Sequence, residues 1–415
     1  MTTANPEETA RTPERLTLRA WAASWLRTVQ EALDRPLTSY YLLLGASALL
    51  LVIGLIMVMS ASSVYAYRYY HGDSYAVVKK QLVWVLLGIP TAWVASRMTQ
   101  RWIRRLAWPG YAFAIALLVL TVFMGTTVNG NKNWLMLGPV QIQASEVAKL
   151  ALVLWAGHIY ALKERRLGSL HHIVMPVVPG LGLATLLVLA GHDLGTALVF
   201  FAILFGLLWV VGAPSRLFTI GLLVVGSGVL FLICTDKQRL TRMGNFLDPF
   251  RDFQGAGWQA GHGLYALSTG GWFGQGIGAS QQKWGDLPEA HTDFIFAVLG
   301  EELGLVGTLL VIGLFAVLAY AAIRVARQTA DPFVRYVSFG VVVWLLGQAL
   351  INIGMVLAFL PVIGIPLPLV SYGGSALLPS LVGLGLVIGF ARREPEAARA
   401  LAQRRKSRST GLSAR

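Results

Sequence analysis

The fold is decided by residues 172–212, HIVMPVVPGLGLATLLVLAGHDLGTALVFFAILFGLLWVVG. Two apolar runs, 172–190 and 194–212, are separated here only by Gly-His-Asp at 191–193. Each run is long enough to cross a bilayer, because a membrane-spanning helix needs about 20 apolar residues. The short connection leaves room only for a tight hairpin. This stretch therefore predicts two antiparallel transmembrane helices.

Similar runs continue in both directions along the chain. Hydrophobic residues make up 55% of the 415 residues and charged residues 13%, whereas a soluble domain carries roughly 25% charged residues. We therefore predict an all-α polytopic membrane protein with about ten transmembrane helices. The expected spans are 39–60, 81–96, 107–125, 146–162, 172–190, 194–212, 216–234, 293–323, 335–358 and 372–391.

The Lys and Arg residues predict the orientation of these spans. With both termini cytoplasmic, 24 of the 34 Lys and Arg residues lie on the cytoplasmic side, 9 lie in outer loops and Lys149 lies within a span. This bias follows the rule that basic residues concentrate in cytoplasmic loops. An odd number of spans would put the basic C-terminal residues outside. The predicted organisation is a cytoplasmic tail (1–38), a ten-helix membrane domain (39–393) with a large extracellular loop between spans seven and eight (235–292), and a disordered basic cytoplasmic tail (394–415).

The net charge and the cysteine content narrow the possible classes of protein further. A net charge of +14 would suggest nucleic acid in a soluble protein. Here the basic residues flank apolar runs, which predicts contact with anionic lipid and no nucleic-acid binding. Cys234 is the single cysteine, so an intrachain disulfide is excluded. We expect no signal peptide, because the first 38 residues are polar.

Asp293 is the main candidate for chemistry, because an ionisable group in a membrane helix is unfavourable unless it is paired or hydrated. It stands in LPEAHTDFIF (287–296), where the outer loop enters the eighth span. Thr292 can cap this helix, which would put Asp293 on one stripe with Phe296, Ala297, Gly300 and Glu301. A partly desolvated carboxylate there would have a raised pKa and could act as a general base. The alternative is that Asp293 only compensates the helix dipole.

Three further charged residues lie at the ends of spans. Glu146 and Lys149 open the fourth span at spacing i, i+3 and can therefore form an ion pair. This pair is either structural or the wall of a polar cavity. Asp193 begins the sixth span, where capping the helix would by itself explain an aspartate.

Two irregular segments interrupt the apolar pattern. The loop 255–278 contains nine glycines and lacks a Walker lysine, so a nucleotide site is not indicated. Its backbone amides could hold a pyrophosphate together with His262, Lys283, Arg239 and Arg242. An irregular loop is an equally good interpretation.

The segment LPVIGIPLPLVSYGGSA (360–376) must line protein or a water-filled cavity, because its prolines and glycines break a helix. We therefore predict a polar cleft between spans eight, nine and ten. On the ninth span, Gln348 and Asn352 are expected to hydrogen-bond between helices.

Four segments together resemble the SEDS family of shape, elongation, division and sporulation proteins. They are NGNKNWLMLGPVQIQASEVAKL (129–150), HDLGTALV (192–199), LPEAHTDFIFAVLGEELGLVG (287–307) and GIPLPLVSYGGSALL (364–378). The resemblance covers nearly the whole membrane region. Within the family the chain is more similar to the FtsW (cell division) type than to the related RodA type.

The resemblance implies the SEDS fold and a peptidoglycan glycosyltransferase. Such an enzyme polymerises lipid II into glycan strands at the outer leaflet of the bacterial plasma membrane and releases undecaprenyl pyrophosphate. The essential aspartate of the family matches Asp293, which we expect to be catalytic. We expect substrate contacts from Glu146, Lys149, Asp193, His291, Lys283, Ser371, Gly373 and Gly374. The resemblance also implies a divalent cation, Mg²⁺ or Mn²⁺, with unassigned ligands.

The resemblance implies partners and a location as well. The expected partners are a class B penicillin-binding protein that performs transpeptidation and other membrane proteins of the division machinery, at the division septum. Two departures from the family pattern stand out. The segment NKNWL (131–135) replaces a more basic sequence, and His192 stands where a proline is common.

Two other classes of function stay open at this point. A lipid II flippase or other transporter also has many spans, intramembrane charges and broken helices, but its polar groups belong near the midplane rather than at the outer mouth. A scaffold that recruits a synthase would need no catalytic aspartate.

Overall fold

The computed structural model describes residues 35–403 apart from 129, 139, 236–239, 241–243, 245, 247, 256 and 286. Among these described residues, nine helical segments are long and apolar enough to cross a membrane. They are α2 (Thr38–Tyr69), α3 (Ala76–Arg97), α4 (Gln100–Met124), α6 with α7 (Leu170–Val174 and Val177–Ala190), α8 (Leu194–Val211), α9 (Ser215–Thr235), α12 (Ile295–Gln328), α13 (Pro332–Val356) and α14 (Gly374–Arg393).

Helix α5 (Ala144–Lys163) is the tenth helix of the bundle. Its 20 residues include the charged Glu146 and Lys149 near its start, and it is not among the nine candidate spans. It packs against α4 and α13 and buries Trp155 and Tyr160 in the core. The predicted all-α membrane fold of about ten helices is therefore confirmed, with nine candidate spans in the described residues and α5 packed among them.

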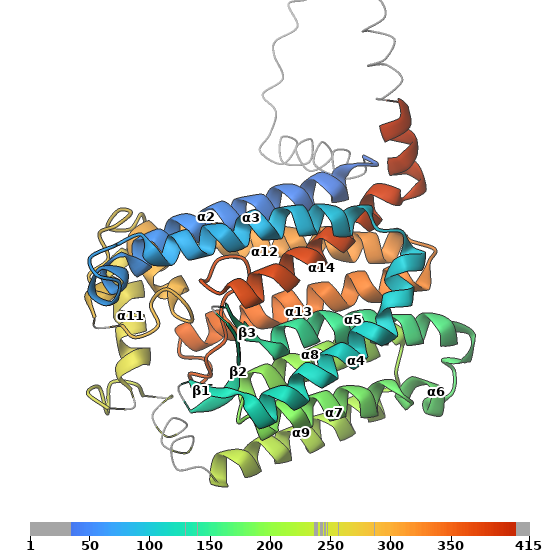
Figure 1. Ribbon diagram of the computed structural model, residues 1–415, viewed down its shortest axis with the longest axis horizontal. Coiled ribbons are helices and arrows are strands. Elements are labelled where there is room, and N and C mark those ends of the chain that lie inside the picture. Colours follow the sequence, from blue (N-terminus) through green and yellow to red (C-terminus); the bar gives the residue numbers. More distant parts are fainter. Residues whose placement is uncertain are drawn as a thin grey trace, which may run out of the picture.

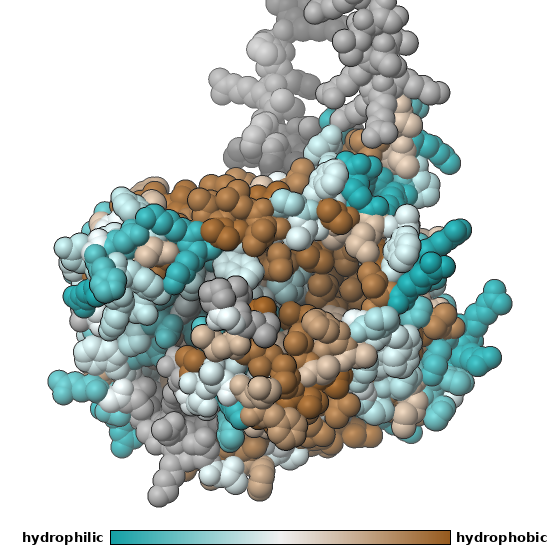
Figure 2. Space-filling view, viewed as in Figure 1, coloured by the Kyte–Doolittle hydropathy of each residue, from teal (hydrophilic) through white to brown (hydrophobic). Residues whose placement is uncertain are grey.

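The helices run side by side, and both described ends of the chain lie at the same end of the bundle (Figure 1). Figure 2 shows a hydrophobic surface across the middle of the bundle and hydrophilic surface at its two ends, as expected for a membrane-embedded belt. The protein is thus a multi-pass membrane protein. The end that carries the first residues of α2 is the cytoplasmic one, because the basic loops gather there.

The segment 126–145, expected to be a loop, forms a small antiparallel sheet at the outer end of the bundle. Its strands are β1 (Thr126–Val128), β2 (Asn131–Leu137) and β3 (Val140–Gln143), in the order β1-β2-β3 with Trp134 opposite Gln143. The sheet is tied to the α7–α8 hairpin because the amide of Lys132 donates to the carbonyl of Gly191 at 2.9 Å. The Lys132 ammonium also donates to carbonyls at the end of α4, so this residue stabilises the helix C-terminus.

The outer loop before α12 also contains regular structure. Residues 258–270, which the glycine content suggested were irregular, form α11 (Trp258–Gly270), which packs against α12. A short turn of 3₁₀ helix follows at Gln282–Trp284, and another, Glu164–Arg166, follows α5. The interpretation of 255–278 as an irregular loop was wrong for 258–270, where small residues let α11 pack closely: a Cβ on Gly270 would lie 1.9 Å from the carbonyl oxygen of Gly300. Residues 271–278 contain no helix or strand.

Helix α12 is broken at Gly304, whose φ of 66° and ψ of −164° are not helical. The segment from Gly271 to Gly276 enters this break. The amides of Gln275 and Gly276 donate to the carbonyls of Glu301 and Glu302, and the amides of Leu305 and Val306 donate to the carbonyls of Gly271 and Trp272. The inserted segment thus satisfies two carbonyls before the break and two amides after it, as a broken helix in a membrane requires.

The structure describes only residues 35–38 and 394–403 of the two predicted tails. Residues 1–34 and 404–415 lie outside the described residues. Residues 395–403 are helical, where we expected disorder. Ala397 of this segment is fully buried, so it packs against the bundle.

Candidate active site

Asp293 lies in a tight turn before α12 rather than within the helix. The turn is closed by the amides of Thr292 and Phe294, which both donate to the carbonyl of Glu289 at 3.1 Å. Glu289 has a φ of 54°, in the left-handed region. The Thr292 hydroxyl donates to the Glu289 carboxylate at 2.6 Å and therefore does not cap α12. The predicted helical stripe that included Asp293 was wrong, because α12 begins only at Ile295.

Three consecutive carbonyls of this turn are held by other elements. The carbonyl of His291 accepts from the amide of Tyr372 at 3.0 Å. The carbonyl of Thr292 accepts from the hydroxyl of Ser371 at 2.6 Å, and the carbonyl of Asp293 accepts from the side-chain amide of Asn352 at 2.7 Å. The position of Asp293 is therefore fixed through its main chain by α13 and by the segment before α14.

The carboxylate of Asp293 is left free for chemistry. No described donor forms a hydrogen bond with it, although the side chain is half-buried. Burial raises the pKa of Asp293 to about 7, and the negative charges of Glu289 and Asp193 add to the effect. A Cβ on Gly364 would lie 3.4 Å from Oδ2 of Asp293, so glycine keeps one approach to the carboxylate open.

Asp193 caps α8, as its position predicts. Its carboxylate accepts from the amide of Thr196 at 2.8 Å and from the hydroxyl of the same residue at 2.9 Å. Asn133 of β2 donates to it at 2.9 Å, so the sheet and the hairpin share this anchor. The NKNWL departure thus has a structural use: Asn133 is a neutral partner for Asp193.

Glu146 and Lys149 form the predicted ion pair, with Nζ and Oε1 2.7 Å apart and both side chains buried. The Lys149 ammonium also donates to Oε1 of Gln348 at 3.0 Å. The amide of Gln348 in turn donates to the carbonyl of Pro366 at 3.0 Å, and Asn352, one turn later, donates to the neighbouring carbonyl of Ile365 at 2.7 Å. Hydrogen bonds therefore connect the charged pair to the same segment that holds Asp293.

The residues around the turn are aromatic or tightly packed. His291 lies between the rings of Tyr65 and Tyr372, with centroid distances of 4.8 and 5.7 Å. Burial lowers the pKa of His291, which favours the neutral ring. Gly374 packs against Trp84, because a Cβ there would lie 2.0 Å from the indole nitrogen. The amide of Gly373 donates to Oε1 of Gln81 at 3.3 Å.

Lys283 does not join the Asp293 site. It is buried, and its ammonium donates to the carbonyl of Gly278 at 2.6 Å, to the hydroxyl of Ser60 at 3.1 Å and to Glu302 at 3.2 Å. These three acceptors match the three donors of an ammonium, so Lys283 is committed to protein atoms. Lys283 therefore anchors the outer loop on α2 and α12, where a contact with pyrophosphate was expected.

Of the other expected cationic contacts, only His262 lies within the described residues. His262 is 2.6 Å from Oε1 of Gln282 and packs against the rings of Phe253 and Trp258. Arg239 and Arg242 lie outside the described residues. No group of three His, Cys, Asp or Glu side chains that could hold a metal ion occurs in the described part of the chain. The described residues therefore do not form an all-protein metal cage.

The family model of the cell cycle proteins FtsW, RodA and SpoVE matches residues 40–395. The chain belongs to this family. It is 40% identical over 371 residues to the "Probable peptidoglycan glycosyltransferase FtsW" of Mycobacterium tuberculosis, covering 89% of this chain and 71% of the relative. The relative of the same name from Geobacter sp. is 36% identical over 355 residues, covering 85% of this chain and 96% of the relative.

Solved structures agree with this membership. A chain from a structure titled "Structural coordination of polymerization and crosslinking by a peptidoglycan synthase complex" matches with a TM-score of 0.70 and 29% identity, over 85% of this chain and 97% of that chain. The rod shape determining protein RodA of Thermus thermophilus matches with a TM-score of 0.64 and 28% identity, over 86% of this chain and 97% of that chain. The SEDS resemblance that the four motifs indicate is confirmed.

Several residues that shape the site were not found from the sequence. Gln81 and Trp84 of α3 pack on Gly373 and Gly374, and Asn133 binds Asp193. For α3, the only local indication of a role at the site was the polar Gln81 in an apolar run, because strongly polar residues are uncommon in membrane spans. Asn133 gave no such signal, since it lies in a polar loop sequence.

Proposed function

We propose that this chain is a peptidoglycan glycosyltransferase that polymerises lipid II, with Asp293 as the general base. The observation that carries the proposal is the free carboxylate of Asp293, whose pKa is raised to about 7 on a turn fixed by three main-chain hydrogen bonds. A base is most effective when its pKa lies near the working pH. The names of the relatives support the same activity.

The reaction requires one proton transfer to the carboxylate of Asp293. The carboxylate accepts the proton of the 4-hydroxyl of one lipid-linked disaccharide. The oxygen then forms a bond to the anomeric carbon of a second glycan, and the bond from that carbon to the pyrophosphate breaks with its electron pair on the leaving group. Because the turn is already held by Ser371, Tyr372 and Asn352, little reorganisation is needed at the moment of reaction.

The leaving pyrophosphate requires positive charge, and the described residues around Asp293 supply little of it. Lys149 is paired with Glu146, and Lys283 is paired with Glu302. A divalent cation held mainly by the substrate phosphates is therefore part of the proposal, since Mg²⁺ needs only one or two carboxylates when phosphates bind it.

The other expected substrate residues are proposed to act in two ways, by shaping the binding site or by positioning the residues around it. His291, Ser371 and Gly373 lie on the turn or in the segment that holds it, and Asp193 is near enough for its charge to raise the pKa of Asp293. These four residues are proposed to shape the binding site. Glu146, Lys149 and Gly374 are proposed to act by positioning, because they are buried and their contacts are with protein atoms.

The partners and the location are proposed from the relatives. The matched peptidoglycan synthase complex supports association with a transpeptidase, for which we propose a class B penicillin-binding protein. The FtsW names among the relatives support work at the division septum together with other division proteins.

The deciding experiment is lipid II polymerisation in detergent by the protein purified with its cognate penicillin-binding protein. Wild type should give long glycan strands and Asp293→Asn none, while Asp73→Asn serves as the control because Asp73 is an exposed outer carboxylate. Full polymerisation by Asp293→Asn would exclude Asp293 as the general base. Lipid II translocation in liposomes without polymerisation would exclude the enzyme in favour of the flippase. Chelation with EDTA, followed by readdition of Mg²⁺ or Mn²⁺, tests the cation.

A further inference from the structure

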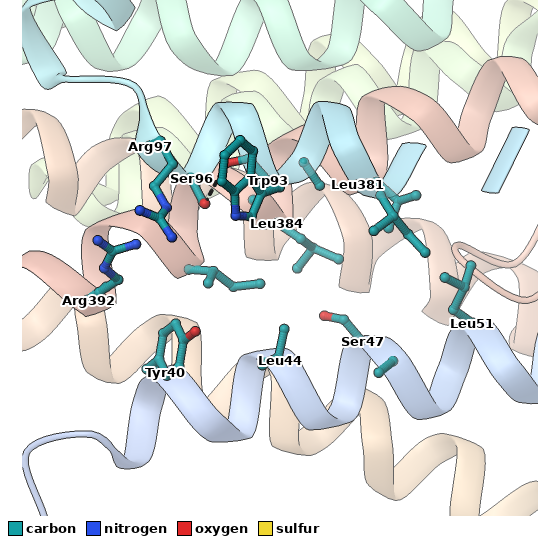
Figure 3. A pocket seen from close by; sticks show the side chains of 15 residues that line it. Tyr40, Leu44, Ser47, Leu51, Trp93, Ser96, Arg97, Leu381, Leu384 and Arg392 are labelled. Atoms are coloured by element: carbon teal, nitrogen blue, oxygen red, sulfur yellow. Dashed lines mark hydrogen bonds between the residues drawn. The ribbon is translucent and has the colours of Figure 1, made fainter. Parts of the chain in front are cut away.

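A groove opens at the end of the bundle opposite Asp293. It has a volume of about 320 Å³ and is lined by three helices. Helix α2 forms one wall with Tyr40, Leu44, Ser47, Ala48 and Leu51, and α3 and α14 form the other with Ile89, Trp93, Leu384, Ile388 and their neighbours. In Figure 3, Leu44 and Ser47 of α2 face the α3–α14 pair across this space.

The groove exists because α3 and α14 pack much more closely with each other than with α2. A Cβ on Gly385 would lie 2.3 Å from the carbonyl oxygen of Ala92, and one on Gly389 would lie 2.4 Å from that of Ser96. Opposite them, α2 presents the small residues Ser47 and Ala48. Small side chains on both walls leave a space that the protein itself does not fill.

The depth of the groove corresponds to one leaflet. The lining residues of α2 run from Tyr40 to Leu51, a rise of about 16 Å in a helix. The hydrocarbon core of a bilayer is about 30 Å thick, so a leaflet contributes about half of that. The groove starts at the first turn of α2 and at the last turns of α3 and α14, which is the cytoplasmic end.

The cytoplasmic end of the groove carries two guanidinium groups. Arg97 ends α3, Arg392 lies in the last turn of α14, and both line the groove. In Figure 3 the two side chains point toward each other. Neither forms an ion pair with a described carboxylate. Two adjacent cations without a carboxylate between them favour an anion, and guanidinium groups match phosphate oxygens in geometry.

We propose that this groove binds an anionic phospholipid of the cytoplasmic leaflet. Its phosphate lies between Arg97 and Arg392, and one acyl chain runs along Leu44, Leu51 and Leu384. Basic pockets between transmembrane helices on the cytoplasmic side are known to select anionic head groups in this way. The site is independent of the Asp293 chemistry, because it lies in the other leaflet.

Native mass spectrometry of the purified protein tests the proposal, with phosphatidylglycerol and phosphatidylcholine titrated separately. Phosphatidylglycerol should bind to wild type, and the double variant Arg97→Gln/Arg392→Gln should bind it about tenfold to thirtyfold more weakly. The matched control is Arg101→Gln/Arg105→Gln, which removes the same charge from exposed positions at the same end of the bundle; its affinity should be unchanged.

A second pair of variants tests the groove itself. Ala48→Phe fills the space between α2 and α14, whereas Leu49→Phe adds similar bulk on an exposed position that does not line the groove. Only Ala48→Phe should weaken phosphatidylglycerol binding while the thermal midpoint of both variants stays near wild type. Equal binding of the neutral lipid, or equal losses in the control variants, would overturn the proposal. Retention of only an undecaprenyl-linked phosphate, with phosphatidylglycerol excluded, would overturn the assignment to a phospholipid.

Discussion

The side-chain amide of Asn352 on α13 donates hydrogen bonds of 2.7 Å to the main-chain carbonyls of both Asp293 and Ile365. One fully buried amide group thus joins the turn that carries the candidate base to the proline-rich segment before α14. Ser371, in that segment, holds the preceding carbonyl of Thr292. The geometry of the site consequently depends on residues far from Asp293 in sequence.

Asn352→Ala should reduce both stability and turnover. It leaves two buried carbonyls without a donor, which we expect to lower the free energy of unfolding by about 2 to 4 kcal/mol. The rate constant kcat should fall more than KM changes, because the turn is displaced while the remaining contacts persist. Ser338→Ala is the matched control, since the Ser338 hydroxyl is buried on α13 without a hydrogen-bond partner. Thermal unfolding and steady-state polymerisation measure the two effects; equal behaviour of both variants would contradict the positioning role.

The pH dependence of activity should report the pKa of Asp293. A general base must be deprotonated, so kcat/KM should rise with pH through about 7. Glu289→Gln removes one of the negative charges that raise this pKa, and the rise should therefore shift to lower pH. Asp73→Asn, at an exposed site, should leave the profile unchanged. A profile that is the same in wild type and Glu289→Gln would argue against Asp293 as the titrating group.

The buried pair Glu146–Lys149 should behave as a unit. Lys149→Met alone leaves the Glu146 carboxylate buried without its cation, which we expect to destabilise the protein by about 3 to 5 kcal/mol. The double variant Glu146→Gln/Lys149→Met removes both charges and should recover most of that loss. If the pair acts only by positioning, polymerisation should recover along with the thermal midpoint. Recovery of stability without activity would instead assign the pair a direct role toward substrate.

The break in α12 should tolerate no side chain. Gly304→Ala places a Cβ 2.4 Å from the amide nitrogen of Gly274 in a backbone region that only glycine adopts readily. We expect a loss of about 2 to 4 kcal/mol, from strain and from displacement of the inserted segment. Gly313→Ala, in the same helix with open space around it, should be neutral or stabilising by up to about 1 kcal/mol. Similar thermal midpoints for the two variants would contradict the tight insertion.

Much of the fold was predictable because membrane insertion is a local property. Apolar runs of bilayer length identify spans wherever they occur in the chain. The weakest of them, α5, was still recognisable, although Glu146 and Lys149 reduce its hydropathy. Helix ends were less accurate: α2 continues to Tyr69, beyond its apolar run, because a helix need not end where the hydrocarbon ends.

The sequence by itself predicted a bundle of about ten spans, the cytoplasmic end of that bundle, and Asp293 as the candidate base. These follow from composition along short stretches and from a motif whose residues are contiguous. Tertiary structure alone decided which groups hold Asp293, that Lys283 anchors a loop rather than facing a pyrophosphate, and that residues 271–276 fill the break in α12. The physical reason is that every buried polar group must find a partner, and which partner it finds depends on residues tens or hundreds of positions away, such as Ser60 for Glu302 or Asn352 for Asp293.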